Sequence, residues 1–163
     1  MKIRTEKKSD IKQITAIHDQ AFNGQDEGKI VENLRRNKNL TISLVCEIDG
    51  KPAGHIAYSP IRDKNEEVIG IGLAPVAVLP SLQNQGIGSQ LIEHGNKKAF
   101  NMGFKKIFVL GDPEYYSRFG FVSAKEYNYY CVYDPEGNHF MIQGEFSKAS
   151  GKTIVYYCKE FNV

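Results

Sequence analysis

The sequence is poor in cysteine, and the three that it has form no pattern. Cys46, Cys131 and Cys158 are an odd number, none lies in CxxC spacing, and each stands in a β-branched or aromatic stretch. This distribution argues against a disulfide framework. We expect buried, free thiols in a reducing cytoplasm.

Long apolar runs and a strong charge of one sign are also absent. The first ten residues are charged, unlike a signal peptide, and no stretch approaches the ~20 apolar residues of a membrane span. The formal charge is only +2, and the basic pairs are scattered among acids, which is not the footprint of a nucleic-acid binder. His18, His94 and His139 have no metal-ligand spacing, so we expect no metal. These absences predict a cytoplasmic protein without a membrane or nucleic-acid partner.

The patterns that are present predict one α/β (α+β) domain spanning residues 1–163. Helical spacing from Ser9 or Asp10 onward, and again over 27–36, predicts two early helices. Two strands over 41–61 meet at Asp49-Gly50, a hairpin signal. A third strand follows at 66–80, then a glycine turn and a helix, then a short strand at 105–110; only the unit at 76–110 demands a parallel crossover. Further strands are expected near 128–133, 139–145 and 153–157, which makes the sheet mixed in direction.

A proline interrupts the third strand. The stretch is apolar on both faces, as in the middle of a sheet, but Pro75 has no N–H to donate to a ladder. We therefore expect this strand to separate from one neighbour near Ala74 and Pro75. Such a splayed strand pair leaves backbone groups free to pair with something else.

Two glycines, Gly86 and Gly88, stand immediately before the amphipathic helix. Glycine in a helix is unfavourable by about 1 kcal/mol relative to alanine, so close approach of a ligand to the backbone is one reason for them. The first amides of a helix have no internal partner and the helix dipole is positive there. The turn therefore predicts a phosphate site; the alternative is a tight connection whose glycines serve packing.

The common nucleotide motifs do not fit this turn. A P-loop requires lysine after the second glycine, whereas Ser89 and Gln90 follow Gly88. The GxGxxG form fails because Leu91 stands where its third glycine belongs. Both nucleotide interpretations are therefore disfavoured.

The stretch VAVLPSLQNQGIGSQLIEHG, residues 76–95, resembles the acyl-CoA signature (Q/R)xxGx(G/A) of the GNAT superfamily of N-acetyltransferases. The resemblance implies a mixed sheet with a V-shaped opening, flanked by helices, and acetyl-CoA as co-substrate. It implies that the strand before the turn lines the pantetheine arm and that the turn amides from Asn84 to Ser89 hold the pyrophosphate. The implied cofactor-binding residues are Val76, Ala77, Val78, Gln83, Asn84, Gln85, Gly86, Ile87, Gly88 and Ser89.

A second motif, YYSRFGF at 115–121, is similar to the Y-x-x-x-G-F of the same superfamily and places its tyrosine at Tyr116. The resemblance implies that this phenol protonates the departing CoA thiolate. An unperturbed tyrosine pKa of ~10 keeps the proton available at neutral pH. A packing role for Tyr116 stays open, and its neighbour Tyr115, four residues before Phe119, is expected to pack. This segment and the C-terminal tail are most similar to a poorly characterised bacterial branch of the superfamily.

The sequence departs from the superfamily pattern at two positions. Many relatives carry a glutamate on the central strand as general base, but Gly72 stands there. Glu66, Glu67, His55 and water remain candidates for the base. Where relatives often have an asparagine after the next strand, Gly111-Asp112 stand here, and we expect Asp112 to cap the short helix that follows.

These features predict an acyl-CoA-dependent N-acyltransferase that moves acetyl from acetyl-CoA to a primary amine by direct attack. A backbone N–H near Val78 would polarise the thioester carbonyl. The alternative is a non-catalytic CoA or acyl-CoA sensor or interaction module with the same fold. The acceptor is a small-molecule or peptide amine with no dedicated motif; we expect its pocket between the early helices and the C-terminal strands. An exposed C-terminal strand would allow two copies to pair as a homodimer.

Overall fold

The computed structural model describes all 163 residues. The helices are α1 (Ile11–Phe22), α2 (Asp26–Arg36), α3 (Ile87–Asn101) and α4 (Pro113–Ser117). The strands are β1 (Lys2–Thr5), β2 (Ile42–Ile48), β3 (Lys51–Arg62), β4 (Val68–Val78), β5 (Lys106–Leu110), β6 (Val122–Ser123), β7 (Tyr129–Cys131), β8 (Phe140–Gly144) and β9 (Thr153–Val155). Short 3₁₀ turns are η1 (Lys8–Asp10), η2 (Pro80–Leu82), η3 (Ala124–Tyr127) and η4 (Lys159–Phe161). None of the helices has the length and apolarity that a membrane span requires.

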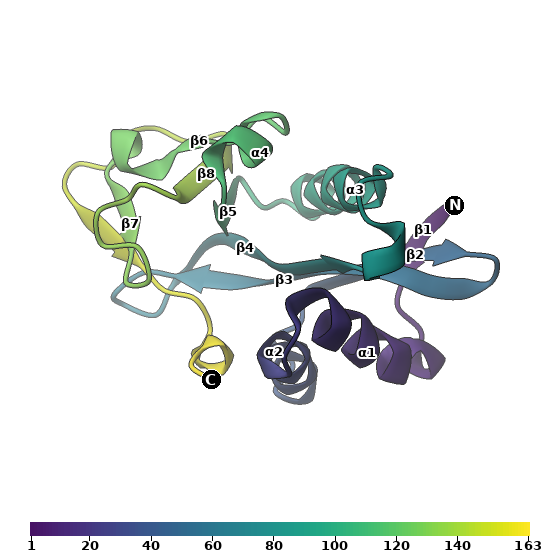
Figure 1. Cartoon of the computed structure of the whole chain (residues 1–163). Helices are drawn as coiled ribbons and strands as arrows, with labels where there is room; N and C mark the ends of the chain where they lie inside the picture. The colour runs from purple at the N-terminus through teal and green to yellow at the C-terminus, as the bar shows by residue number, and fades with distance from the viewer.

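Seven strands form one sheet in the order β1-β2-β3-β4-β5-β8-β6. Every neighbouring pair is antiparallel except β4 and β5, which are joined through α3. Figure 1 shows α1 and α2 on one face of this sheet and α3 and α4 on the other. The mixed α/β fold and the parallel crossover through α3 are confirmed.

Local signals placed the first two thirds of the chain correctly. The hairpin between β2 and β3 turns at Asp49 and Gly50, which both have positive φ. Asp112 caps α4, since its carboxylate accepts a 3.0 Å hydrogen bond from Glu114 N. The apolar stripe of α3 is buried in a core cluster that includes Ile56, Tyr58 and Leu73 from the sheet. The three cysteines are buried and unpaired, as expected.

The expected splay of the central strand is also confirmed. β4 pairs with β5 only at Ile71 and Gly72, and no residue from Leu73 onward has a partner on that side. On the other side, the register with β3 passes from Leu73 directly to Val76, so Ala74 and Pro75 form a bulge. Proline lacks the donor that a continued ladder needs. The two strands therefore diverge from Gly72 toward the start of α3.

One expectation was wrong. Asp10 occupies the position before α1, but its carboxylate accepts from Arg4 and from the Lys7 amide and does not cap the helix. The strands expected near the C-terminus are present, and the structure divides them between two sheets: β8 inserts beside β5, whereas β7 and β9 pair in parallel in a separate two-stranded sheet. These strands are three to five residues long, and such short strands carry little information about their partners.

Candidate active site

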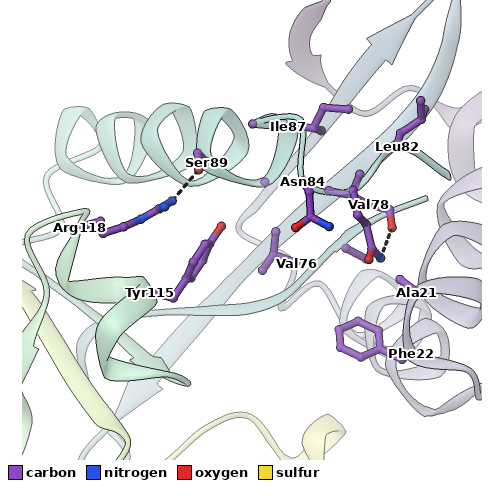
Figure 2. A pocket seen from close by; sticks show the side chains of 14 residues that line it. Ala21, Phe22, Val76, Val78, Leu82, Asn84, Ile87, Ser89, Tyr115 and Arg118 are labelled. Carbon is purple, nitrogen blue, oxygen red and sulfur yellow. Dashed lines mark hydrogen bonds between the residues drawn. The ribbon is translucent and has the colours of Figure 1, made fainter. Parts of the chain in front are cut away.

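A cavity of about 560 Å³ lies at the open end of the split between β4 and β5. Its walls come from the end of α1, the last residues of β4, the turn before α3, the first turn of α3, and α4. The lining residues are Ala21, Phe22, Val76, Ala77, Val78, Leu82, Gln83, Asn84, Gly86, Ile87, Gly88, Ser89, Tyr115 and Arg118. Figure 2 shows Tyr115 and Arg118 reaching toward the first turn of α3, with Val76 and Asn84 across from them. The split therefore continues into a space large enough for part of a ligand.

Unpartnered backbone amides border one side of this cavity. Gly86 takes a left-handed conformation, with φ +84°, and Gln90 N makes the first hydrogen bond of α3, to Gly86 O. The amides of Ile87, Gly88 and Ser89 precede that bond and have no intrahelical acceptor. The positive end of the helix dipole adds to their attraction for an anion. The turn thus has the geometry of a phosphate site.

The free edge of β4 borders the other side. Val76, Ala77 and Val78 pair with Ile56, His55 and Gly54 of β3, and their opposite edge has no strand beside it. Backbone groups on such an edge can bond an extended ligand as another strand would.

All but one of the ten cofactor-binding residues suggested by the sequence line this cavity. The exception is Gln85, which is exposed outside it. Gln83 lines the cavity, but its side chain folds back and Nε2 donates to Val78 O at 3.1 Å (Figure 2). That side chain therefore holds the turn against the end of β4, and its amide nitrogen is already engaged.

The sequence did not identify Tyr115 or Arg118 as cavity residues. Tyr115 packs against Phe119 as expected, but its hydroxyl would lie only 3.2 Å from a Cβ atom at Gly88. The Arg118 guanidinium lies 4.8 Å from the centre of the Tyr115 ring and donates a 3.0 Å hydrogen bond to Ser89 Oγ. A basic side chain at the C-terminal end of a short capped helix gave no sequence signal that it would reach α3.

Tyr116 lies beside the cavity and does not line it. Its ring packs against Gly111, where an added Cβ would meet Tyr116 Cε2 at 2.4 Å, and against the edge of Phe121. Burial, and then the charge that Tyr115 would carry, raise the pKa of Tyr116 to about 12. The Tyr116 hydroxyl is therefore protonated at neutral pH.

The structure does not bring the candidate general bases together at the point where β4 and β5 diverge. Glu66 and Glu67 are exposed in the turn before β4, and six residues of extended strand, ~20 Å at about 3.3 Å per residue, separate Glu67 from Leu73. No carboxylate lines the cavity. Cys46 is buried in the core, on β2 between β1 and β3.

His55 is fully buried in a hydrogen-bonded chain of side chains. Ser43 Oγ donates to Glu6 at 2.6 Å, so His55 Nε2 must donate its 2.8 Å bond to Ser43 Oγ. His55 Nδ1 is then an acceptor for His18 Nε2, 2.8 Å away. Burial lowers the pKa of both imidazoles, that of His18 to about 4. Both rings are neutral, and both nitrogens of His55 are occupied.

Gly72, the position at which the superfamily pattern has a glutamate, is covered by Tyr157 from the C-terminal segment. A Cβ atom at Gly72 would lie 3.0 Å from Tyr157 Cε1 and 2.8 Å from Ile61 Cδ1. The Tyr157 hydroxyl is buried and has no hydrogen-bond partner. A side chain at position 72 and the Tyr157 ring would therefore compete for the same space.

The chain matches a known family model and named relatives over most of its length. The model of the acetyltransferase (GNAT) family matches residues 11–121. The protein named Uncharacterized N-acetyltransferase YhbS, from Escherichia coli strain K12, is 33% identical over 165 residues, which cover 99% of each chain.

Two solved structures share the whole architecture. The crystal structure of the E. coli GNAT family N-acetyltransferase YhbS in complex with CoA matches with a TM-score of 0.92 and 31% identity, over 99% of this chain and 92% of that one. A GNAT family acetyltransferase from Brucella melitensis in complex with acetyl-CoA matches with a TM-score of 0.83 and 35% identity, over 98% and 97%. Both relatives hold a coenzyme A species, which agrees with a phosphate-binding turn beside an open strand edge. This chain is therefore a member of the GNAT family of N-acetyltransferases.

Proposed function

We propose that the protein transfers the acetyl group of acetyl-CoA to a primary amine of a small molecule by direct attack. The observation that carries this proposal is the cavity at the split, bordered by the open edge of β4 and by the unpartnered amides of α3. The open edge of β4 fits a pantetheine arm, and the unpartnered amides of α3 fit a diphosphate. The CoA and acetyl-CoA bound by the two relatives support this assignment.

In this proposal the backbone binds most of the cofactor. Val76, Ala77 and Val78 offer their free edge to the pantetheine amides, while the amides from Asn84 to Ser89 hold the diphosphate. Arg118 adds a positive charge at the same turn through its contact with Ser89. The thioester is then directed toward the point where β4 and β5 diverge, and a backbone N–H near Val78 polarises its carbonyl.

The reaction proceeds by direct attack, without a covalent enzyme intermediate. The protons lost and gained in it balance. The neutral amine attacks the thioester carbon, the new C–N bond forms, and the C–S bond of the tetrahedral intermediate breaks. The nitrogen loses one proton and the CoA sulfur gains one. We assign the hydrogen bond to the leaving sulfur to Tyr116, whose raised pKa keeps it protonated.

Water is the proton acceptor that fits the geometry best. Glu66 and Glu67 lie in the turn before β4, far from the point where β4 and β5 diverge. Both ring nitrogens of His55 already take part in hydrogen bonds. The amine would therefore reach the site neutral or lose its proton to solvent.

A second candidate function is a CoA or acyl-CoA sensor without turnover. It is favoured by the lack of any carboxylate in the cavity and by Gly72 at the position where many relatives have a base. Such a protein would bind CoA through the same turn and leave the thioester intact.

Release of free thiol from acetyl-CoA, followed with a panel of amines, separates the two functions. The transferase predicts thiol release with at least one amine, together with its acetylated product. It also predicts that Tyr116→Phe lowers kcat by about a hundredfold, the lower end of the range for a general acid, without changing CoA affinity. Tyr127→Phe, remote from the cavity, is the matched control. Binding of acetyl-CoA without thiol release for every amine would favour the sensor.

A further inference from the structure

A second cavity of about 490 Å³ opens on the same side of the sheet as α2. It lies between the β3–β4 turn, Asn39 three residues after the end of α2, and the C-terminal segment. η4 lies on the same side of the sheet as α2 (Figure 1), and Cys158 and Phe161 share an apolar cluster with Ile30 and Leu34. None of its lining residues lines the first cavity, in which we propose that CoA binds.

Tyr157 connects this cavity with the split. It lines the cavity, and its ring lies over Gly72 at the last paired position of β4 and β5. Its buried hydroxyl has no partner. Burial is the main reason that its pKa lies well above the usual tyrosine value, so it is a neutral phenol that can accept or donate a hydrogen bond but cannot serve as a base.

Glu160 also lines the cavity and is only 6% exposed. Its Oε1 accepts hydrogen bonds from the side-chain amides of Asn37 and Asn39, at 2.8 and 3.0 Å, but its Oε2 has no partner. Burial by itself raises the pKa of this carboxyl, but hydrogen bonds from Asn37, its own backbone and Asn39 outweigh it, and the net pKa lies below the usual value. Glu160 is therefore ionised with one oxygen unsatisfied.

An ionised carboxylate oxygen that is buried without a partner is costly, and a ligand cation would offset that cost. No ion pair neutralises Glu160, which takes part in none of the five in the protein, and Lys159 acts on its carboxylate only through its charge, without a direct contact. Arg62, on the same cavity, also has no carboxylate partner; its Nη1 lies 3.8 Å from Cys158 Sγ. The cavity thus offers a negative group for a cation and a positive group that is not yet neutralised.

Building on the proposed transferase function, we propose that this second cavity holds the acceptor, and that the acceptor is a small diamine. One ammonium group of the diamine binds Glu160 Oε2. The other amine, neutral, lies beside the Tyr157 hydroxyl, which accepts a hydrogen bond from its N–H and directs its lone pair toward the thioester. If the acceptor also has a carboxylate, Arg62 is the group that receives it.

The test compares thiol release from acetyl-CoA with 1,4-diaminobutane, lysine and butylamine as acceptors. Butylamine has the same chain as 1,4-diaminobutane but lacks the second amine. We expect kcat/KM to be at least tenfold higher for a diamine than for butylamine in the unmodified protein, a result that requires no variant. Faster transfer to lysine than to 1,4-diaminobutane would indicate that Arg62 also binds the carboxylate of the acceptor. Equal rates for all three amines would overturn the proposal and leave the transferase intact.

Variants then assign the roles of the two side chains. Glu160→Gln, which keeps an oxygen for Asn37 and Asn39, should lower kcat/KM for the diamine about tenfold and change that for butylamine less than twofold. Glu32→Gln, which replaces an exposed carboxylate of α2 outside both cavities, should change neither. Tyr157→Phe should lower kcat for both amines without changing the KM for acetyl-CoA. An equal loss for both amines in Glu160→Gln would overturn the assignment of Glu160.

The absence of thiol release with every amine would contradict the transferase itself. In that case calorimetric titration of 1,4-diaminobutane into the CoA-saturated protein tests the cavity separately. Binding that Glu160→Gln weakens about tenfold would uphold the diamine site, and no heat of binding in the unmodified protein would overturn it.

Discussion

Arg118 donates a 3.0 Å hydrogen bond to Ser89 Oγ and so joins the end of α4 to the first turn of α3. The two residues are 29 positions apart, on the two motifs that flank β5. The contact holds a guanidinium beside the unpartnered amides of α3. A diphosphate at that turn would therefore meet both backbone donors and a fixed positive charge.

The first prediction concerns that charge. Arg118→Gln should raise the Kd for CoA about fivefold to tenfold, because a charge-assisted hydrogen bond is worth about 1.5–3 kcal/mol and solvent exposure reduces it. Calorimetric titration with CoA and with pantetheine, which has no phosphate, measures the effect. Lys105→Gln is the control. An equal loss for pantetheine would show that Arg118 acts on packing and not on phosphate.

The second prediction separates ligand binding from backbone strain at Gly86. Gly86 and Gly103 both have left-handed φ values, +84° and +98°, and an added Cβ would meet no atom within 4 Å at either. Alanine at either position should lower the free energy of unfolding by about 1–2 kcal/mol, because L-residues disfavour this conformation. Only Gly86→Ala should also weaken CoA binding, since its methyl group would stand at the phosphate site. Equal CoA affinity in both variants would contradict the assignment of the turn.

The third prediction concerns the packing of α3 on the sheet. A Cβ atom at Gly95 would lie 2.3 Å from the Tyr58 hydroxyl and 2.5 Å from its ring carbon Cε2. Tyr58 is fully buried and its hydroxyl donates to Asn96 Oδ1, so the ring has no room to move. Gly95→Ala should therefore destabilise the protein by about 1–3 kcal/mol in spite of the higher helix propensity of alanine. Urea unfolding measures this, with Lys97→Ala, exposed on the same helix, expected within about 0.5 kcal/mol of the unmodified protein.

The fourth prediction is a loss of stability at mildly acidic pH. His18 and His55 have pKa values below the ordinary value of 6.5, because of burial, and His18 titrates at about 4. The unfolded chain therefore binds more protons than the folded one once the pH falls below about 6.5. The free energy of unfolding should fall by up to about 1.4 kcal/mol per pH unit for each histidine between pH 6 and 4.5.

Urea unfolding at pH 7, 6 and 5 checks this dependence. His94→Gln, at an exposed position of α3, should leave the difference between pH 7 and pH 5 unchanged. A stability that is flat across this range would mean that the two rings are protonated in the folded protein as well.

The sequence predicted the elements whose signals are local. The hairpin at Asp49-Gly50, the capped helix after Asp112 and the apolar stripe of α3 all depend on residues within one or two turns of each other. The split of β4 from β5 was also predictable, because Pro75 cannot donate to a ladder wherever the chain folds. The same kind of local reasoning failed for Asp10, because the carboxylate bonds to Arg4 and the Lys7 amide in place of its own helix.

The composition of the candidate site was only partly predictable. The turn from Asn84 to Ser89 has a sequence signature because backbone amides and glycine are local features. Tyr115 and Arg118 gave no such signal, since their positions at the cavity depend on how α4 packs against α3. The second cavity was not predictable in its details, because Tyr157 and Glu160, which line it, belong to no sequence motif.

By itself, the sequence determined the order of the elements, the interruption at Pro75 and the glycine turn before α3, because each follows from the covalent properties of proline and glycine and from hydrophobic spacing. Only the tertiary structure decided which side chains meet. It brings Tyr157 over Gly72, separated by 85 residues, and leaves one oxygen of Glu160 without a partner. Contacts of this kind depend on the packing of the C-terminal segment against the sheet and α2, and no local pattern encodes that packing.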